Sequence, residues 1–145
     1  MFHTLAYYAI VFHRSFTAYT TQQLQQLGLN FGSLFSVIYV GKHPGCTQAE
    51  LTAALGLDWG YSQRSITKLV EDGFLAREKS GRAYHLDLSP KGQQAFQVSH
   101  QVFFDWDKEV LAALDPEERE QLLALLAKAM KKEASSTCTI PSKAP

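Results

Sequence analysis

Residues 47–89, TQAELTAALGLDWGYSQRSITKLVEDGFLAREKSGRAYHLDLS, contain the pattern that decides the fold. The stretch opens with TQAE at 47–50, a capping box in which the Thr hydroxyl and the Glu carboxylate satisfy each other's free backbone N–H groups. The short helix that follows is predicted to stop at Gly56, and Asp58 offers a side-chain oxygen to a second helix over about 59–72. Two helices joined by a short turn that contains Gly indicate a helix-turn-helix.

Behind the second helix, apolar residues recur at every second position on both sides of a polar segment, EKSG at 78–81. This spacing is typical of strands with one buried face. The apolar positions are Phe74 and Leu75 before the segment, and Tyr84, Leu86 and Leu88 after it. The pattern predicts a two-stranded hairpin with EKSG at its tip, which is the wing of a winged helix.

The same stretch resembles the core of the multiple-antibiotic-resistance regulator (MarR) family of bacterial transcription factors. The family's pattern is L-x3-L-G-V-D, a helix carrying T-R, then G-L-V-x-R, D-x-R and L-T-x-K-G. The resemblance implies a homodimer whose terminal helices interlace, and a winged helix that binds DNA. The matching positions in this chain are Leu51, Leu55-Gly56-Leu57-Asp58, Arg64, Leu69, Gly73-Phe74-Leu75, Arg77, Arg82, Leu88-Ser89 and Lys91-Gly92.

Three features depart from the family pattern. The wing is shorter than is usual, and Ser80-Gly81-Arg82 replaces D-x-R, so the aspartate that would hold the wing arginine is missing. The second helix also carries Ser62 and Ser65 where apolar residues are commoner. Because Gly adds backbone freedom at the tip, we expect ordering of the wing on DNA to cost more and its readout to be weaker than is typical.

Four further segments show apolar residues at steps of three and four, which predicts six helices in all. The fold class is therefore mainly α, an α+β winged helix with six helices and a two-stranded β-wing, dimerising through its N- and C-terminal helices. The four segments are 1–28, 30–42, 90–114 and 116–133.

The predicted organisation is one domain followed by a tail. The tail, 134–145, has too little apolar content to fold and is expected to be disordered. The domain spans 1–133, with dimerisation helices at about 1–28 and 90–133 and the winged helix-turn-helix at about 31–89.

The first helix is poor in charge, because Arg14 is the only Lys, Arg, Asp or Glu in the first 41 residues. A helix on the surface of a monomer normally has a charged outer face. Its absence favours burial against a partner chain, and a second copy is the partner that the resemblance implies. The alternative is a hydrophobic helix in the core of one subunit.

The composition excludes several classes of protein. The 145-residue chain has 14 basic and 14 acidic side chains and no net charge, whereas a non-specific nucleic-acid coat would be strongly basic. Residues 59–92 contain six basic and four acidic side chains, a small local surplus of positive charge. No secretory signal is recognisable, and the longest early apolar run is too short to cross a membrane. We expect a cytoplasmic protein without a membrane partner.

The two cysteines, Cys46 and Cys138, lack C-x-x-C spacing, which excludes a zinc ribbon or a disulfide framework as the design. Cys46 precedes the predicted cap of a helix, where the helix N-terminus would lower the pKa of the thiol and make it reactive. The alternative, which we favour, is a small residue in a turn.

Catalytic motifs are missing from the sequence, so we expect no enzyme and no cofactor. There is no Gly-rich phosphate loop and no G-x-S-x-G. The five histidines show no H-E-x-x-H or i, i+4 pairing, so a metal site would depend on tertiary folding and no metal ligand is assigned.

The helix over 59–72 is expected to enter the major groove of double-stranded DNA. Gln63 and Arg64 are suited to bidentate contacts with adenine and guanine edges, and Lys68 to a phosphate. The resemblance adds Arg82 as a wing arginine for the minor groove. The expected DNA-binding residues are Gly60, Tyr61, Gln63, Arg64, Thr67, Lys68 and Arg82.

Aromatic residues, 12% of the chain, gather on the helices that meet in the family's dimer crevice. An apolar pocket with a few polar groups suits a small aromatic effector, although core packing explains any single aromatic residue as well. The effector-pocket residues that we expect are Tyr8, Phe12, His13, Tyr39 and Trp106.

These observations favour a ligand-responsive repressor that binds a palindromic operator as a homodimer. The alternative is a winged-helix protein–protein interaction module without its own operator. Salt-dependent binding to DNA distinguishes the two, because phosphate contacts release counterions.

Overall fold

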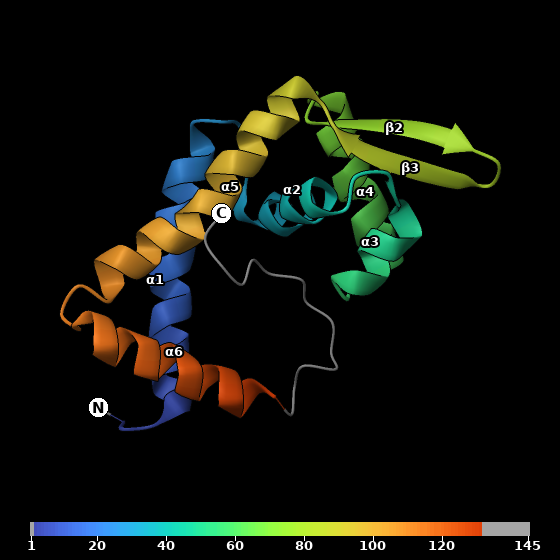
Figure 1. The fold of residues 1–145 in the computed structure, drawn as a ribbon. Helices are drawn as coiled ribbons and strands as arrows, with labels where there is room; N and C mark the ends of the chain where they lie inside the picture. The colour runs from blue at the N-terminus through green and yellow to red at the C-terminus, as the bar shows by residue number, and fades with distance from the viewer. Residues whose placement is uncertain (1, 132–145) are drawn as a thin grey trace.

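The computed structural model describes residues 2–131, and this part of the chain forms six helices and a small antiparallel sheet (Figure 1). These elements confirm the mainly α, six-helix winged-helix fold that the sequence predicts. The predicted disordered tail, 134–145, lies outside the described residues. The helices are α1 (Leu5–Gln25), α2 (Phe31–Lys42), α3 (Gln48–Ala54), α4 (Trp59–Glu71), α5 (Pro90–Val110) and α6 (Pro116–Met130). The strands are β1 (Cys46–Thr47), β2 (Leu75–Ser80) and β3 (Ala83–Leu88).

Side-chain caps start the helices, but the first residue of α1 and the last residues of α1 and α5 differ from the prediction. Thr4 accepts a hydrogen bond from the Tyr7 amide, so α1 begins at Leu5 rather than at residue 1. The helix ends at Gln25, because the following turn places Gly28 at φ 77°, a conformation that glycine adopts without strain. Helix α5 likewise ends at Val110 rather than at residue 114.

The sheet has three strands in the order β1-β3-β2, whereas the sequence predicted a two-stranded wing. The Gly45 amide donates to the Leu86 carbonyl, and this bond lays β1 alongside β3. A strand of two residues carries no periodic signal, which is why the pattern missed it.

The wing is a regular hairpin whose pairing runs from Leu75 opposite Leu88 to Ser80 opposite Ala83. Its tip is therefore the two-residue turn Gly81–Arg82, and the prediction of an EKSG tip is wrong. Gly81 has φ 65°, which two-residue hairpin turns require at a central position. The glycine thus serves a tight turn, and Arg82 stands at the end of the wing.

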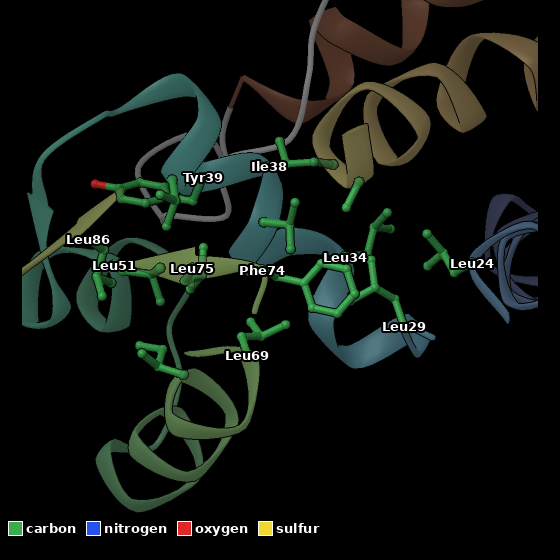
Figure 2. Close-up of a cluster of buried hydrophobic side chains, with 14 of the residues drawn as sticks. Leu24, Leu29, Leu34, Ile38, Tyr39, Leu51, Leu69, Phe74, Leu75 and Leu86 are labelled. Atoms are coloured by element: carbon green, nitrogen blue, oxygen red, sulfur yellow. The ribbon is translucent and has the colours of Figure 1, made fainter. Parts of the chain in front are cut away.

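One hydrophobic core lies beneath the winged helix and extends along α2 to the end of α1 and into α5 (Figure 2). Helix α2 crosses its middle, and Leu34, Val37 and Ile38 are fully buried. At its periphery, α1 contributes only Leu24 as a buried apolar residue, and α6 has no buried residue. The core therefore belongs to the winged helix and its supports, and the outer parts of the terminal helices stand outside it.

The start of α5 is joined closely to the winged helix. Ser89 caps α5 through the Gly92 amide, and its hydroxyl lies 3.0 Å from the Phe74 carbonyl oxygen. Lys91 Nζ donates to the Asp72 carbonyl at the end of α4, at 2.8 Å. A Cβ built on Gly92 would overlap the carbonyl oxygen of Phe74, so only glycine permits this approach. These contacts give a physical reason for the L-S-x-K-G segment, which matches the family pattern L-T-x-K-G with serine in place of threonine.

Within residues 2–131, none of the helices combines the length and apolar character that a membrane span needs.

Candidate nucleic-acid interface

Helix α4 is held from both its end and its inner face. Asp58 caps it by accepting from the Tyr61 amide at 3.0 Å. Ser62, Ile66 and Leu69 face inward and are buried. The Ser62 and Thr52 hydroxyls lie 2.6 Å apart, and since Thr52 already donates to the Gln48 carbonyl, Ser62 is the donor between them. The unusual serine thus joins the two helices of the helix-turn-helix by a buried hydrogen bond.

The outer face of α4 forms a shallow groove of about 460 Å³. Gln63, Arg64 and Lys68 are exposed there, as the helical period predicts. A Cβ built on Gly60 would lie 3.3 Å from Arg64 Nη1, so the small residue leaves the guanidinium room along the first turn of α4. The groove is lined by Gly60, Gln63, Arg64, Thr67, Lys68 and Glu71.

Tyr61 lies on the flank of α4 that faces α2. Its ring is 43% exposed, and a Cβ built on Gly32 would lie 2.8 Å from its hydroxyl oxygen. Tyr61 also closes one side of a mostly apolar cavity of about 190 Å³. The other residues that line this cavity are Phe31, Gly32, Phe35, Ser36, Leu55 and Leu57.

Thr67 faces the wing. Its hydroxyl oxygen accepts a hydrogen bond from Arg77 Nη1 on β2 at 3.3 Å, and the residue is half-buried. The Arg77 guanidinium carbon in turn lies 5.2 Å from the centre of the Tyr84 ring on β3. Lys79 Nζ lies 5.8 Å from the same ring. Sequence reasoning assigned no role to Arg77 or Tyr84; the available signal was the spacing of two, which puts 77 and 79 on one face of β2.

The basic residues of the interface differ in whether they form ion pairs. Lys68 Nζ lies 3.1 Å from an Asp72 carboxylate oxygen, but with side chains 69% and 38% exposed this pair contributes little to stability. Arg64 and Arg82 are exposed, and neither forms an ion pair with any residue in the range 2–131. The wing carries Arg82 away from the body of the molecule (Figure 1). These two guanidinium groups are therefore available to an anionic partner.

Trp59 is a further exposed residue of α4 to which sequence reasoning assigned no role. It is the first residue of α4 and is 51% exposed. The available signal was a large aromatic residue directly after the Asp58 cap, in the first turn of the second helix. Exposed aromatic rings of this kind are enriched at interfaces.

The residues expected to form an effector pocket do not all come together. The Phe12 and Trp106 rings meet edge to face with centroids 5.9 Å apart, and His13 packs 6.2 Å from Phe31. Tyr8 lies near the start of α1, where its hydroxyl is 3.3 Å from a ring nitrogen of His3.

Tyr39 is separate from these residues. Its ring stacks on His43 at 4.2 Å, and it lies at the opposite end of the core from Leu24 of α1 (Figure 2). Tyr39 is also 7% exposed, so it serves the winged-helix core rather than the aromatic cluster between α1 and α5.

Cys46 is a buried thiol in β1. Burial, followed by the nearby Glu50 and Asp87 carboxylates, raises its pKa to about 11. The hypothesis that the helix N-terminus makes this thiol reactive is therefore wrong, because desolvation outweighs any effect of the helix end. Among the described residues, no group of three or more His, Cys, Asp or Glu side chains is placed to hold a metal ion.

A capped helix with an exposed polar face, set beside a projecting hairpin, defines a winged helix-turn-helix protein. A model of the MarR family matches residues 37–83. The chain is 44% identical over 138 residues to the HTH-type transcriptional regulator BilQ of Clostridium symbiosum, covering 93% of this chain and 96% of that protein.

Solved structures share the fold. A MarR transcriptional regulator from Methanosarcina mazei superposes with a TM-score of 0.81 at 20% identity, covering 90% of each chain. The S. aureus MepR–DNA complex gives a TM-score of 0.76 at 19% identity, covering 90% of this chain and 98% of that one. The chain belongs to the MarR family of DNA-binding transcriptional regulators. The matching relatives are named as regulators and not as enzymes.

Proposed function

We propose that the protein is a homodimeric repressor that binds a palindromic operator and releases it when a small aromatic ligand binds. The observation that carries this proposal is the exposed apolar side chains of the terminal helices, together with the near absence of charge on α1. No residue from Leu5 to Arg14 is buried, and Leu5 and Ile10 are 64% and 61% exposed. On α6, Leu125 and Met130 are 65% and 55% exposed.

A second copy of the chain is the partner that we propose for this surface. Helix α6 and the N-terminal half of α1 both lie at the end of the molecule away from the wing (Figure 1). Isolated exposed apolar residues are ordinary, but a contiguous patch marks an interaction site. Covering it with the same patch of a second chain would create a two-fold axis and leave both wings free.

The two-fold axis would determine the symmetry of the operator. Two copies of α4 related by such an axis would read two half-sites about one helical turn, ~34 Å, apart, and the operator would then be a palindrome. Gln63 and Arg64 would contact base edges, Lys68 a phosphate, and Arg82 the minor groove. A regulator of this kind would work in the cytoplasm, where the bacterial chromosome lies.

The effector would bind beside the aromatic residues between α1 and α5. The Phe103 and Trp106 rings pack there with centroids 4.9 and 5.4 Å from that of Phe16. Phe12 contacts Trp106, and His13 packs on Phe31, which itself contacts Phe16. Trp106 Nε1 donates to Ser15 Oγ at 3.1 Å, so the ring joins the two helices. A ligand that separated them would change the distance between the two α4 helices of the dimer. Tyr39 is not included in this site, because it lies elsewhere in the fold.

Binding of a duplex selected by the protein from a random pool tests the proposal. The affinity should fall with salt by a slope of roughly −0.9 in log K for each phosphate contact. Arg64→Ala should cost about 1–3 kcal/mol and relax the preference at one base pair of each half-site. Equal loss on every sequence would make Arg64 a phosphate contact, and failure to enrich any duplex would favour the protein-interaction module.

Ligand response and repression need separate measurements. Thermal unfolding in the presence of a set of phenolic acids should give a rise in melting temperature for the effector, and the same compound should release bound DNA. Transcription in vitro from a promoter that contains the selected duplex should fall when the protein is added. Activation instead of loss of transcription would contradict the repressor role.

A further inference from the structure

One side chain of the wing touches two other parts of the DNA-facing surface. Arg77 lies on β2, its Nη1 donates to Thr67 Oγ1 on α4 at 3.3 Å, and its guanidinium carbon lies 5.2 Å from the ring centre of Tyr84 on β3. Arg77 is half-buried, whereas Arg64 and Arg82 are exposed. A single guanidinium thus links the helix to both strands of the wing.

We propose that Arg77 is a positioning residue that fixes the angle of the wing against α4, so that Arg82 and Arg64 can contact one DNA duplex together. The inference rests on the proposed operator binding through α4 and the wing. It also reassigns Thr67, whose hydroxyl serves the wing rather than a base.

A small change of angle at Arg77 would produce a large displacement at the tip of the wing. Arg77 pairs with Leu86 in the middle of the hairpin, and the tip lies beyond Ser80. At ~3.3 Å per strand residue, Arg82 stands roughly 15 Å beyond Arg77. A rotation of the hairpin by about 10° at Arg77 would then move the tip by roughly 2–3 Å, enough to break a hydrogen bond between the tip and DNA.

The chemistry of the contact requires arginine. A guanidinium is planar, so it can lie on the Tyr84 ring with its face and donate to Thr67 with its edge. A lysine ammonium at the same position could keep the charge but not both contacts. Lys79, two residues further along β2, is exposed and provides a comparison, because it is near the same ring but donates no hydrogen bond to α4 within the described residues.

Double-mutant analysis on the selected duplex, with A·T-rich flanks, tests the role. In the unmodified background, Arg82→Ala should weaken binding by no more than about fivefold. In the Arg77→Ala background the same change should have almost no effect, since a wing that is not held gains nothing from Arg82. Arg77→Lys should behave like Arg77→Ala. Lys79→Ala is the matched control, and its effect should add to that of Arg82→Ala.

Two other variants approach the contact from its partners. Tyr84→Leu and Thr67→Val each remove one partner of Arg77, and each should reduce the effect of Arg82→Ala in the same way. Tyr84 is 42% exposed, so its replacement is expected to keep the fold even where Arg77→Ala does not. In the DNA-free protein, amide exchange at residues 79–84 should become several-fold faster in these variants while the melting temperature stays within a few degrees.

The outcomes distinguish the positioning role of Arg77 from operator binding itself. If Arg77→Ala lowers the salt slope by about one, Arg77→Lys restores it, and Arg82→Ala keeps its full effect, then Arg77 is a phosphate contact and the positioning role is wrong. Additive effects with normal binding by the unmodified protein would also overturn that role alone. Failure of the unmodified protein to bind any duplex would overturn the operator function, and the positioning role with it.

Discussion

The winged helix and the terminal helices differ in how much apolar surface they bury within one chain. From α2 to β3, the chain buries Val37, Leu51, Ile66 and Leu86 completely. Helix α6 has no buried residue, and the first half of α1 has none either. A region with its own core is defined within one chain, whereas a region that exposes apolar side chains is completed only by another surface. The winged helix is therefore complete within one chain, whereas α6 and the first half of α1 are left exposed.

The exposed apolar residues of α1 give the largest predicted effect. Leu5→Asp with Ile10→Asp places two carboxylates in the apolar patch, where burial of unpaired charge is costly. We expect a monomer or an insoluble chain, as measured by sedimentation velocity. Gln97→Asp, a charge change at an exposed position of α5, should leave a dimer. A soluble dimer in the double variant would show that the two chains associate through another surface.

A substitution in the winged helix should instead act within one chain. Gly92→Ala pushes a methyl group into the Phe74 carbonyl, and we expect a loss of roughly 3 kcal/mol in the free energy of unfolding. Urea denaturation measures this loss. Gly28→Ala is the control, because Gly28 has φ 77° but open space around it, and should cost only about 1–2 kcal/mol. Gly92 has an ordinary helical φ, so equal losses would mean that α5 and the Phe74 carbonyl move apart at less cost than the overlap implies.

The buried hydroxyl pair of the helix-turn-helix should contribute a smaller amount. Ser62→Ala removes one donor but leaves the Thr52 hydroxyl bonded to the Gln48 carbonyl, so we expect a loss of about 1 kcal/mol. Thr52→Val leaves the Ser62 hydroxyl without this acceptor and should cost more. Denaturation of both variants and the double variant gives the coupling energy. Full additivity would argue against the bond between the two hydroxyls.

The smallest effect concerns pH and lies in α5, which connects the two regions. Burial, followed by the nearby Lys42 charge, lowers the pKa of His100 in the folded protein. Above about pH 6.5 the imidazole is neutral in both states and stability is complete; below it the unfolded chain takes up the proton first, so stability falls. One such group contributes a slope of at most about 1.4 kcal/mol per pH unit. Denaturation at pH 7.5 and 5.5 should show less pH dependence for His100→Gln than for the unmodified protein.

Sequence reasoning was successful where the signal is local. Thr47 with Glu50, and Asp58, cap the helices that they were expected to start, and Ser89 and Asp115 cap α5 and α6 in the same way. Such caps are recognisable because the residues that bond are three apart, a distance fixed by helix geometry alone. The outward set on α4 follows from the same geometry, since a period of 3.6 residues decides which side chains share a face.

The tertiary structure decided what residues distant in the sequence do to one another. Thr67 has the outward position that the period predicts, but Arg77 comes to its hydroxyl from another element. Cys46 stands at a helix start, yet burial raises its pKa to about 11. Tyr39 has the character of a pocket aromatic and lies in the core of the winged helix. The sequence by itself determined the six helices, the wing hairpin and the family. Packing decided the third strand and the partners of each side chain, because those depend on how the elements meet in space and not on any spacing along the chain.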